Sequence, residues 1–292
     1  MKILITGSRG QLGHDVVNVL EADHHLLSLD LPELDITDFK SLKNVIGEFR
    51  PDVVINCAAY TQVDTCETQK ELAHAVNAIG PDNLSRCLAD HGGRFIHIST
   101  DYVFNGKKPI PEIYIEKDPT HPVSVYGETK LSGEQSIQQN LNNYVILRTS
   151  WLYGINGGNF LKTILRLSMK DSNPVIRVVD DQYGSPTWSY RLAKQIAAIL
   201  DSDANGIYHA TAEGYCTWFE LAKAFLSQMG INKEIVACTT PEYPTAAKRP
   251  MNSILENFRL KSEKTNEMID WKQDLNKFVS LHRDQLIKEA VQ

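Results

Sequence analysis

Two side chains suited to acid and base catalysis stand four positions apart in the middle of the chain, Tyr126 and Lys130. Residues at i and i+4 of a helix share one face, so the phenol and the ammonium lie near each other. The ammonium and the first turn of the helix both favour phenolate, so we expect the tyrosine pKa to fall from about 10 toward neutrality. Such a tyrosine can exchange a proton with a substrate oxygen, and Thr100 can donate a second hydrogen bond to that oxygen.

The spacing of this pair is not specific, because the chain contains a second example, Tyr190 and Lys194. We interpret the second pair as a surface feature, since the apolar stripe of that helix leaves it on the opposite face. The first pair has a different context, because it follows a strand that ends in the hydroxyl-bearing residues Ser99 and Thr100. The stripe of the second helix consists of Trp188, Leu192, Ile196 and Ile199.

A glycine-rich turn near the N-terminus separates a short β-branched run from a helical pattern; it reads Gly7-Ser8-Arg9-Gly10-Gln11-Leu12-Gly13. Gly7 permits a tight turn, Gly10 lets a phosphate approach the backbone, and Gly13 lets the helix pack closely on the strand. Free N–H groups at the helix start then face the pyrophosphate of a dinucleotide. The alternative is an ordinary turn, which a position between a strand and a helix disfavours.

Charged residues near this turn predict how the adenosine end of a dinucleotide is held. Asp30 ends the second strand, where a carboxylate can accept from a ribose hydroxyl, although it also suits a solvated turn. Arg9 can instead meet a ribose 2′-phosphate, so these two residues favour different cofactors. Asp35 and Ile36 can lie beside adenine, and a helix-entry role for Asp35 is equally compatible with the pattern.

The elements that must position these residues alternate between strand and helix in the first half of the chain. Short apolar runs separated by helices predict an α/β fold with a doubly wound parallel sheet of the Rossmann type. We expect a dinucleotide-binding domain over residues 1–149, with returning elements from about 175–200. Residues 150–292 are expected to form mainly a smaller, interleaved α/β substrate lobe. The expected strands are 2–6, 25–30, 53–56, 94–99 and 144–149, and the expected helices are 38–49, 63–77, 82–90, 125–139, 158–169, 187–200, 217–229 and 272–289.

Composition excludes several classes of protein. The 292 residues are 42% hydrophobic with a net charge of −6, and basic residues form no block of the kind that binds nucleic acid. No apolar stretch is long enough to span a bilayer, and Met1-Lys2 leads directly into a strand, so we expect a cytoplasmic protein without a signal peptide. The five cysteines lack a C-x-x-C spacing, which predicts free thiols and no metal site.

Several motifs together resemble the dTDP-4-dehydrorhamnose reductases, a family of the extended short-chain dehydrogenase/reductase superfamily. The resemblance covers nearly the whole chain and implies reduction of dTDP-4-dehydro-L-rhamnose to dTDP-L-rhamnose with NADPH or NADH, for surface polysaccharide synthesis. The segments that carry it are 7–13, Asn56-Cys57-Ala58-Ala59-Tyr60-Thr61-Gln62-Val63-Asp64, Ser99-Thr100-Asp101-Tyr102-Val103-Phe104, 126–130, Arg148-Thr149-Ser150-Trp151, 181–187 and Arg249-Pro250-Met251-Asn252-Ser253.

The resemblance also implies roles for individual residues. The catalytic group is Thr100, Tyr126 and Lys130. The cofactor is lined by Gly10, Gln11, Leu12, Asp30, Asp35, Ile36, Ala59, Tyr60 and Thr61, and the sugar nucleotide meets Val63, Thr100, Asp101, Tyr102 and Trp151, with Arg249 offsetting the diphosphate. Some family members form Mg²⁺-linked dimers through glutamates. Because the helix-one position here is Asp15, the sequence does not support Mg²⁺, while a homodimer remains open.

Three alternatives remain at this point. A related nucleotide-sugar epimerase or dehydratase would hold NAD⁺ tightly and return the hydride within one cycle. A non-catalytic regulatory subunit, as in the methionine adenosyltransferase relative of this family, would keep the fold and lose the tyrosine or lysine, yet both are present. A third alternative is a reductase of a different deoxysugar nucleotide.

Overall fold

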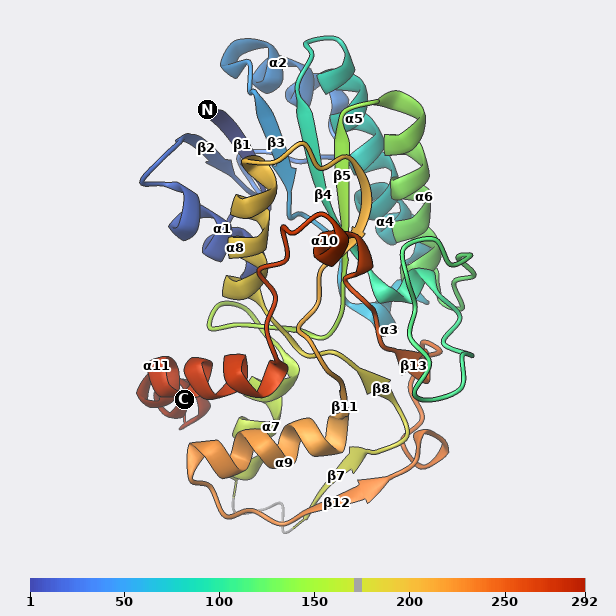
Figure 1. Ribbon diagram of the computed structural model, residues 1–292, viewed down its shortest axis with the longest axis vertical. Helices are drawn as coiled ribbons and strands as arrows, with labels where there is room; N and C mark the ends of the chain where they lie inside the picture. Colours follow the sequence, from blue (N-terminus) through green and yellow to red (C-terminus); the bar gives the residue numbers. More distant parts are fainter. Residues whose placement is uncertain (171–174, 292) are drawn as a thin grey trace.

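The computed structural model describes residues 1–170 and 175–291, and its centre is a parallel sheet (Figure 1). The strands run in the order β2-β1-β3-β4-β5-β10, and every neighbouring pair is parallel. This arrangement confirms the predicted doubly wound α/β fold. The strands are β1 (Lys2–Thr6), β2 (His25–Leu29), β3 (Val53–Asn56), β4 (Arg94–Thr100), β5 (Tyr144–Thr149) and β10 (Gly206–His209).

Alternation along the strands creates one apolar core on each face of the sheet. On β1, Ile3 and Ile5 face one core and Leu4 faces the other, as the two-residue period of a strand requires. The first core is covered by α1 (Gln11–Leu20) and α8 (Ser189–Leu200), and the second by α2 (Phe39–Phe49), α5 (Gly80–Ala89) and α6 (Val125–Asn140). Both faces are therefore buried, which explains the continuous apolar runs of these strands.

A second body of structure lies beyond the carboxyl ends of the strands and has its own core (Figure 1). Its helices are α7 (Phe160–Ser168), α9 (Trp218–Met229) and α11 (Trp271–Val291). Small sheets join them: β7 (Ile176–Val179) with β12 (Ile235–Cys238), β6 (Leu152–Tyr153) with β9 (Thr187–Trp188), and β8 (Tyr183–Gly184) between β11 (Cys216–Thr217) and β13 (Asn252–Ser253).

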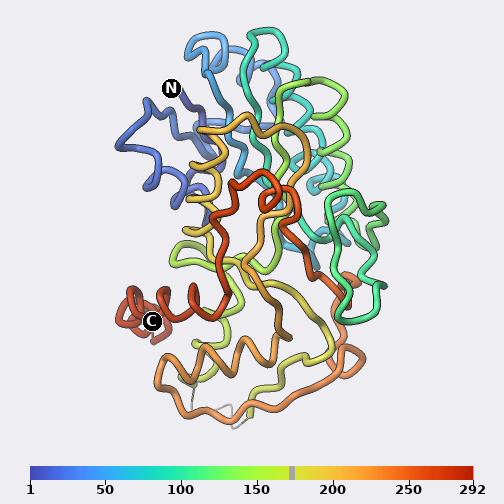
Figure 2. Tube along the Cα trace, viewed as in Figure 1, coloured from blue at the N-terminus to red at the C-terminus, as the bar shows by residue number. Residues whose placement is uncertain are grey.

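The chain passes between the sheet and this second body several times (Figure 2). Helix α8 packs on α1, β10 joins the main sheet, and α10 (Phe258–Ser262) packs on β10. Within the stretch 175–200, which we expected to return to the sheet, α8 does so, whereas β7 pairs with β12 in the second body. The boundary near residue 150 therefore remains a prediction.

One predicted helix, over residues 63–77, is divided. The structure has α3 (Val63–Cys66), α4 (Lys70–His74) and a π-helical turn over Ala75–Ile79 that runs into α5. Such turns often occur beside functional sites. The π turn brings Asn77 against the loop after β3, where its amide bonds both the N–H and the carbonyl of Tyr60, at 2.8 and 3.0 Å.

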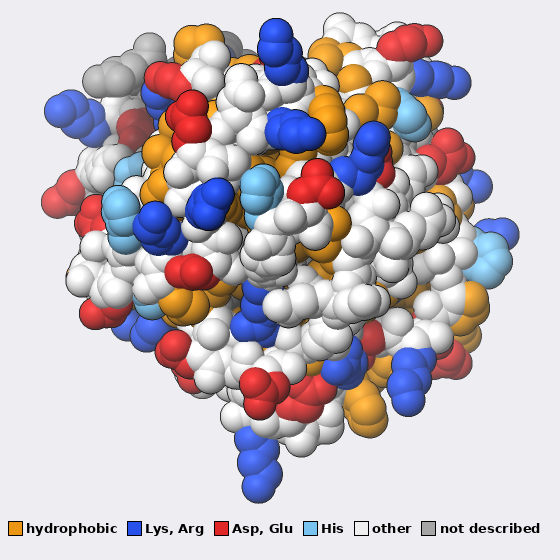
Figure 3. Space-filling view, turned by 90° about the horizontal axis from the view of Figure 1, so that it is seen from above, with side chains coloured by type: hydrophobic (Ala, Val, Ile, Leu, Met, Phe, Trp, Pro, Cys, Tyr) orange, Lys and Arg blue, Asp and Glu red, His pale blue; other side chains and the backbone are white. Residues whose placement is uncertain are grey.

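The surface and the cysteines agree with the composition. Acidic and basic side chains alternate over the face shown in Figure 3. The five cysteines are free; four are buried, whereas Cys57, which directly follows β3, is half-buried. Among the described residues, we find no helix long and apolar enough to cross a membrane and no group of three or more metal-ligating side chains.

Candidate active site

A cleft of about 390 Å³ opens at the carboxyl edge of the main sheet, where ligands of such sheets bind. It brings together twelve of the predicted site residues from the glycine turn, the loop after β3, the end of β4, the start of α6 and the turn after β5. They are Gly10, Gln11, Leu12, Ala59, Thr61, Val63, Thr100, Asp101, Tyr102, Tyr126, Lys130 and Trp151.

The glycine turn has the geometry that its sequence predicts. Gly7 has φ of +70°, and a Cβ there would lie 2.5 Å from the backbone nitrogen of Ala58. A Cβ on Gly13 would lie 2.0 Å from the carbonyl oxygen of Gly7, so the helix start can pack on the turn only without a side chain. Gly10 caps α1 without a side chain and borders the cleft, so the first-turn N–H groups are free to face an anion.

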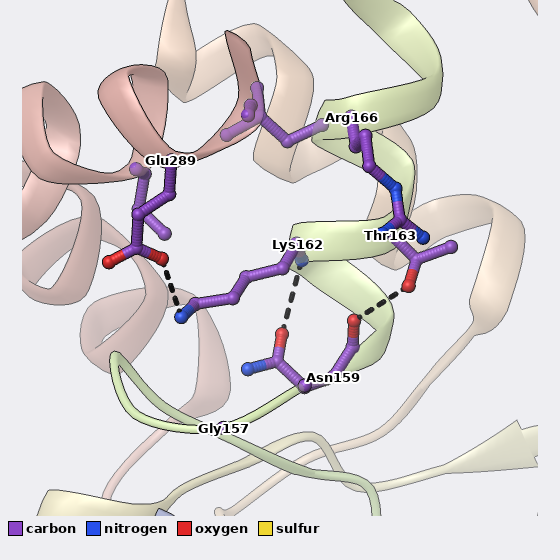
Figure 4. A pocket seen from close by; sticks show the side chains of 10 residues that line it. Gly157, Asn159, Lys162, Thr163, Arg166 and Glu289 are labelled. Carbon is purple, nitrogen blue, oxygen red and sulfur yellow. Dashed lines mark hydrogen bonds and ion pairs between the residues drawn. The ribbon is translucent and has the colours of Figure 1, made fainter. Parts of the chain in front are cut away.

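The loop over residues 154–159 fixes Gln11 at the start of α1. Asn159 donates to Gln11 Oε1 at 2.9 Å and to the carbonyl of Gly154 at 2.8 Å. The same asparagine caps α7, as Figure 4 shows, and Lys162 reaches across the adjoining hollow to Glu289 at 2.7 Å. This hollow shares Gly158 with the cleft. Its lysine is neutralised by Glu289, so the hollow carries no free positive charge at that position.

Tyr126 and Lys130 come from the first turns of α6 and line the cleft together with Thr100 at the end of β4. Ser124 caps this helix by accepting from the N–H of Gly127 at 3.2 Å, which fixes where α6 begins. The Lys130 amine is buried and donates to the carbonyl of Ile98 at 2.7 Å. Burial lowers the pKa of Lys130 to about 8, against the raising effect of Glu134.

The expected fall of the Tyr126 pKa is wrong for this structure. Burial raises the pKa of Tyr126, and a hydrogen bond with Thr100 opposes the rise only in part. Tyr126 therefore carries its proton at neutral pH, the form that a general acid needs.

Asp101 is a buried carboxylate beside the Thr100 hydroxyl. Its Oδ1 accepts from Thr100 Oγ1 at 3.0 Å, and Thr100 in turn accepts from the N–H of Tyr102 at 3.2 Å. Burial raises the pKa of Asp101 to about 6, and hydrogen bonds from Ser253 and Thr100 oppose the rise. These contacts fix the Thr100 hydroxyl at the cleft wall.

The predicted adenosine-binding residues lie on the exposed side of the glycine turn. Asp30 accepts from the backbone N–H of Arg9 at 2.9 Å, and the Arg9 guanidinium donates to the carbonyl of Leu31 at 3.0 Å and pairs with Glu33. Arg9 therefore already has an anionic partner where a 2′-phosphate would bind.

Asp35 and Ile36, predicted to lie beside adenine, make contacts within the protein itself. Asp35 accepts from the N–H and hydroxyl of Thr37, both at 2.8 Å, in a local turn three residues before Asp38, which caps α2. Ile36 is buried in the core beneath α2 and α5. Neither contact provides evidence for an adenine site, so their roles remain predictions.

The indole of Trp151 forms one wall of the cleft. Trp151 has φ of +48° and stacks on Trp218 with ring centroids 3.5 Å apart and planes at 9°. A Cβ on Gly184 would lie 2.4 Å from the Trp151 ring, so glycine is required for the ring to lie there. Trp151, predicted as a contact of the sugar nucleotide, lines the cleft, whereas its stacking partner Trp218 was not predicted, since an aromatic residue at the start of a helix gives no distinct signal.

Arg249 lies beyond this wall in an ion pair. Its two terminal nitrogens bond both oxygens of Asp64, at 3.0 and 2.8 Å, and the guanidinium lowers the pKa of Asp64. Arg249 lines a neighbouring hollow of about 300 Å³, together with Trp218 and Tyr243. The pairing with Asp64 was not predicted, because the two residues are far apart in the sequence.

Comparison with known proteins identifies the family. A family model described as the RmlD substrate binding domain matches residues 1–283. The chain is 36% identical to a dTDP-4-dehydrorhamnose reductase of Burkholderia thailandensis, over 93% of this chain and 96% of the relative. The chain belongs to the dTDP-4-dehydrorhamnose reductase family. The resemblance seen in the sequence motifs is thereby confirmed.

Two further relatives have a cofactor or a substrate in their names. The crystal structure of a dTDP-4-dehydrorhamnose reductase from Bacillus anthracis in complex with NADP has a TM-score of 0.92 and 38% identity, over 96% of this chain and 98% of that one. A dTDP-4-keto-6-deoxy-D-glucose reductase of Streptomyces niveus is 38% identical, over 78% of each chain.

Proposed function

We propose that this protein reduces the C4 ketone of dTDP-4-dehydro-L-rhamnose to give dTDP-L-rhamnose, with NADPH or NADH as the reductant. The observation that carries the proposal is the convergence of Thr100, Tyr126 and Lys130 with the glycine turn in one cleft. Family membership supports the same reaction. Its product serves surface polysaccharide synthesis.

The dinucleotide supplies the hydride, and the protein supplies its position and the proton. Tyr126 donates its phenolic proton to the C4 oxygen, while Thr100 donates a hydrogen bond to the same oxygen. Lys130 holds the ribose next to the nicotinamide. Because the two hydroxyls come from β4 and α6, the ketone is pinned at the carboxyl edge of the sheet, where its C4 meets the hydride.

The glycine turn holds the pyrophosphate, since Gly10 and the free N–H groups at the start of α1 suit an anion. Gly7, Gly13, Gln11 and Leu12 complete this part of the site. The remaining cofactor residues are those predicted from the sequence, Arg9, Asp30, Asp35, Ile36, Ala59, Tyr60 and Thr61, within a domain over residues 1–149.

The sugar nucleotide extends from the ketone toward the second body. Val63, Asp101 and Tyr102 surround the sugar, and Trp151 forms one wall of the cleft. Arg249 meets the diphosphate, which requires that it exchange Asp64 for the ligand's oxygens. These contacts belong to the substrate lobe proposed over residues 150–292.

Two further features belong to this proposal. The enzyme acts in the cytoplasm, where dTDP-sugars and reduced dinucleotides are available. A homodimer of this enzyme is not bridged by Mg²⁺ through Asp15, because Asp15 is buried and bonded to Ser189 at 2.5 Å. Sedimentation with and without a chelator tests this statement.

The second candidate substrate is dTDP-4-keto-6-deoxy-D-glucose, which the name of the Streptomyces niveus relative suggests. An epimerase would retain stoichiometric NAD⁺ on purification, and a regulatory subunit would give no turnover. A screen of 4-keto nucleotide sugars against NADPH oxidation distinguishes these cases. We expect the highest kcat/KM with dTDP-4-dehydro-L-rhamnose; a higher value with the D-glucose derivative would move the assignment to that substrate.

A further inference from the structure

Three buried polar side chains form one row across the main sheet, Thr6 on β1, Asn56 on β3 and His97 on β4. The strand register pairs Thr6 with Asn56 and Asn56 with His97, so the three project from the same face. None is more than 1% exposed. The row continues an apolar row of Leu4, Val54 and Phe95, which lies two residues earlier and packs beneath the helices on the α6 side.

The hydrogen bonds of this row fix the orientation of the Asn56 amide. Asn56 Oδ1 accepts from Thr6 Oγ1 at 2.7 Å and from the backbone N–H of Ala58 at 3.1 Å. Because the backbone N–H can only donate, the oxygen must lie on that side. The Nδ2 group is then the one that faces His97 Nδ1, at 3.0 Å.

The orientation of Asn56 in turn determines which nitrogen of His97 carries the proton. Nδ1 accepts from the amide, so the neutral imidazole bears its hydrogen on Nε2. Nε2 lies 3.2 Å from the amine of Lys130. An N–H group directed at this amine suits a neutral nitrogen with a lone pair and disfavours an ammonium, which has only hydrogens to offer.

We propose that the row Thr6-Asn56-His97 sets the charge of Lys130, with His97 acting as a positioning residue whose fixed Nε2–H favours the neutral amine. The inference rests on the proposed function, in which Lys130 holds the cofactor ribose. The side chains of the sheet then control the charge of that lysine. When the Lys130 amine becomes an ammonium, it loses its favourable contact with the His97 Nε2–H. A hydroxyl or phenolate oxygen in the cleft that accepts a hydrogen bond from Lys130 stabilises this charged form.

The other titratable groups near Lys130 leave His97 as the adjustable neighbour. Burial raises the pKa of the Cys57 thiol to about 12, so the thiol is neutral. Glu134, on the helix of Lys130, accepts from Arg148 Nε at 2.9 Å, from Arg148 Nη2 at 2.6 Å and from Ser99, so Arg148 offsets its charge, although Glu134 still raises the pKa of Lys130. Burial and Lys130 together keep the pKa of His97 well below its usual value, so His97 stays neutral.

The Asn56→Asp variant reverses the direction of the hydrogen bond between residue 56 and His97, with almost no change in the shape of the side chain. A carboxylate at this position still accepts from Thr6 and Ala58, and its second oxygen accepts from His97 Nδ1–H. The imidazole proton then moves to Nδ1, and Nε2 becomes an acceptor for the Lys130 ammonium. Together with the added negative charge, this change raises the pKa of Lys130.

Two measurements test the proposal. Long-range ¹H–¹⁵N spectra of histidine-labelled protein report the tautomer, with the His97 signals assigned by their loss in His97→Gln. We expect the Nε2–H form in the wild type and the Nδ1–H form in Asn56→Asp. The second measurement is the pH dependence of kcat/KM. We expect the wild type to lose activity as the pH rises through about 8, where the Lys130 ammonium loses its proton, and we expect the variant to move this alkaline limb up by about one unit or more.

The proposal is overturned by an Nδ1–H tautomer in the wild type, or by an unchanged alkaline limb in an Asn56→Asp protein whose tautomer has switched. Asn257→Asp, which places a carboxylate at another buried asparagine, should lower stability and leave the limb in place. If Asn56→Asp does not fold, His97→Glu takes its place: one carboxylate oxygen accepts from the Asn56 amide and the other accepts from the Lys130 ammonium, so the limb must again move up. The tautomer arm needs no substrate, so it fails or succeeds independently of the proposed reaction.

Discussion

The ring of Tyr126 packs edge-on against Tyr102, with centroids 5.4 Å apart and planes at 78°. This contact involves only the rings, so a phenylalanine at position 126 can keep it. The hydroxyl group is therefore separable from the packing that holds the side chain in the cleft.

Tyr126→Phe should keep the fold and NADPH binding but lower kcat by about 10²- to 10⁴-fold, the loss expected of a missing general acid. Steady-state kinetics with cofactor titration measure both effects. The matched control is Tyr190→Phe, which removes a hydroxyl from the second Tyr/Lys pair. Near-normal turnover in Tyr126→Phe, with damage in Tyr190→Phe, would show that the wrong pair was chosen.

Arg9 pairs with Glu33, so under the prediction that Arg9 binds the 2′-phosphate of NADPH, Glu33 competes with that phosphate. Glu33→Gln should therefore tighten NADPH relative to NADH, and Arg9→Ala should weaken NADPH by about tenfold or more with little effect on NADH. Fluorescence titration of both cofactors gives the ratio, with Glu48→Gln on α2 as a control for the lost charge. Equal effects on the two cofactors would remove Arg9 from the phosphate site.

The sequence predicted most of the fold because its local signals agree with its packing. Strands β3 and β5 appear at their predicted bounds, since apolar runs between Pro, Gly and Asp breaks leave little choice of register. The predicted helix over 63–77 failed because nothing local reveals that Asn77 must turn toward the backbone of Tyr60. Pairings such as Arg249 with Asp64 arise only from tertiary folding, and the Tyr126 pKa depends on burial that no spacing reveals.

Gly184→Ala should displace the Trp151 indole, because the new Cβ would lie 2.4 Å from that ring. We expect a higher KM for the sugar nucleotide, an unchanged affinity for the dinucleotide, and a stability loss of about 1 to 3 kcal/mol from overpacking. Kinetics and urea unfolding measure these quantities. The control is Gly47→Ala in α2, where the nearest atom to the new Cβ would be His91 Nε2 at 3.9 Å. This variant should not raise KM, and an equal rise there would contradict the account.

Asp101→Asn should stabilise the protein at neutral pH while lowering activity. The folded-state pKa of about 6 exceeds the ordinary value of 3.8, so the ionised carboxylate costs stability as the pH rises through this range. The gain from asparagine should be about 1 to 3 kcal/mol above about pH 7 and vanish near about pH 4. Urea unfolding at both pH values measures it; a gain that is the same at both would show that ionisation is not its cause.

The most direct test of the proposed reaction follows the hydride itself. NADPH that carries deuterium at the transferable position is incubated with dTDP-4-dehydro-L-rhamnose, and the product sugar is analysed by mass spectrometry and proton NMR. We predict dTDP-L-rhamnose with deuterium at C4 only and one NADPH consumed per product, because Thr100 and Tyr126 hold that carbonyl oxygen at the sheet edge. An unlabelled product without net NADPH consumption, or label at another carbon, would contradict the account.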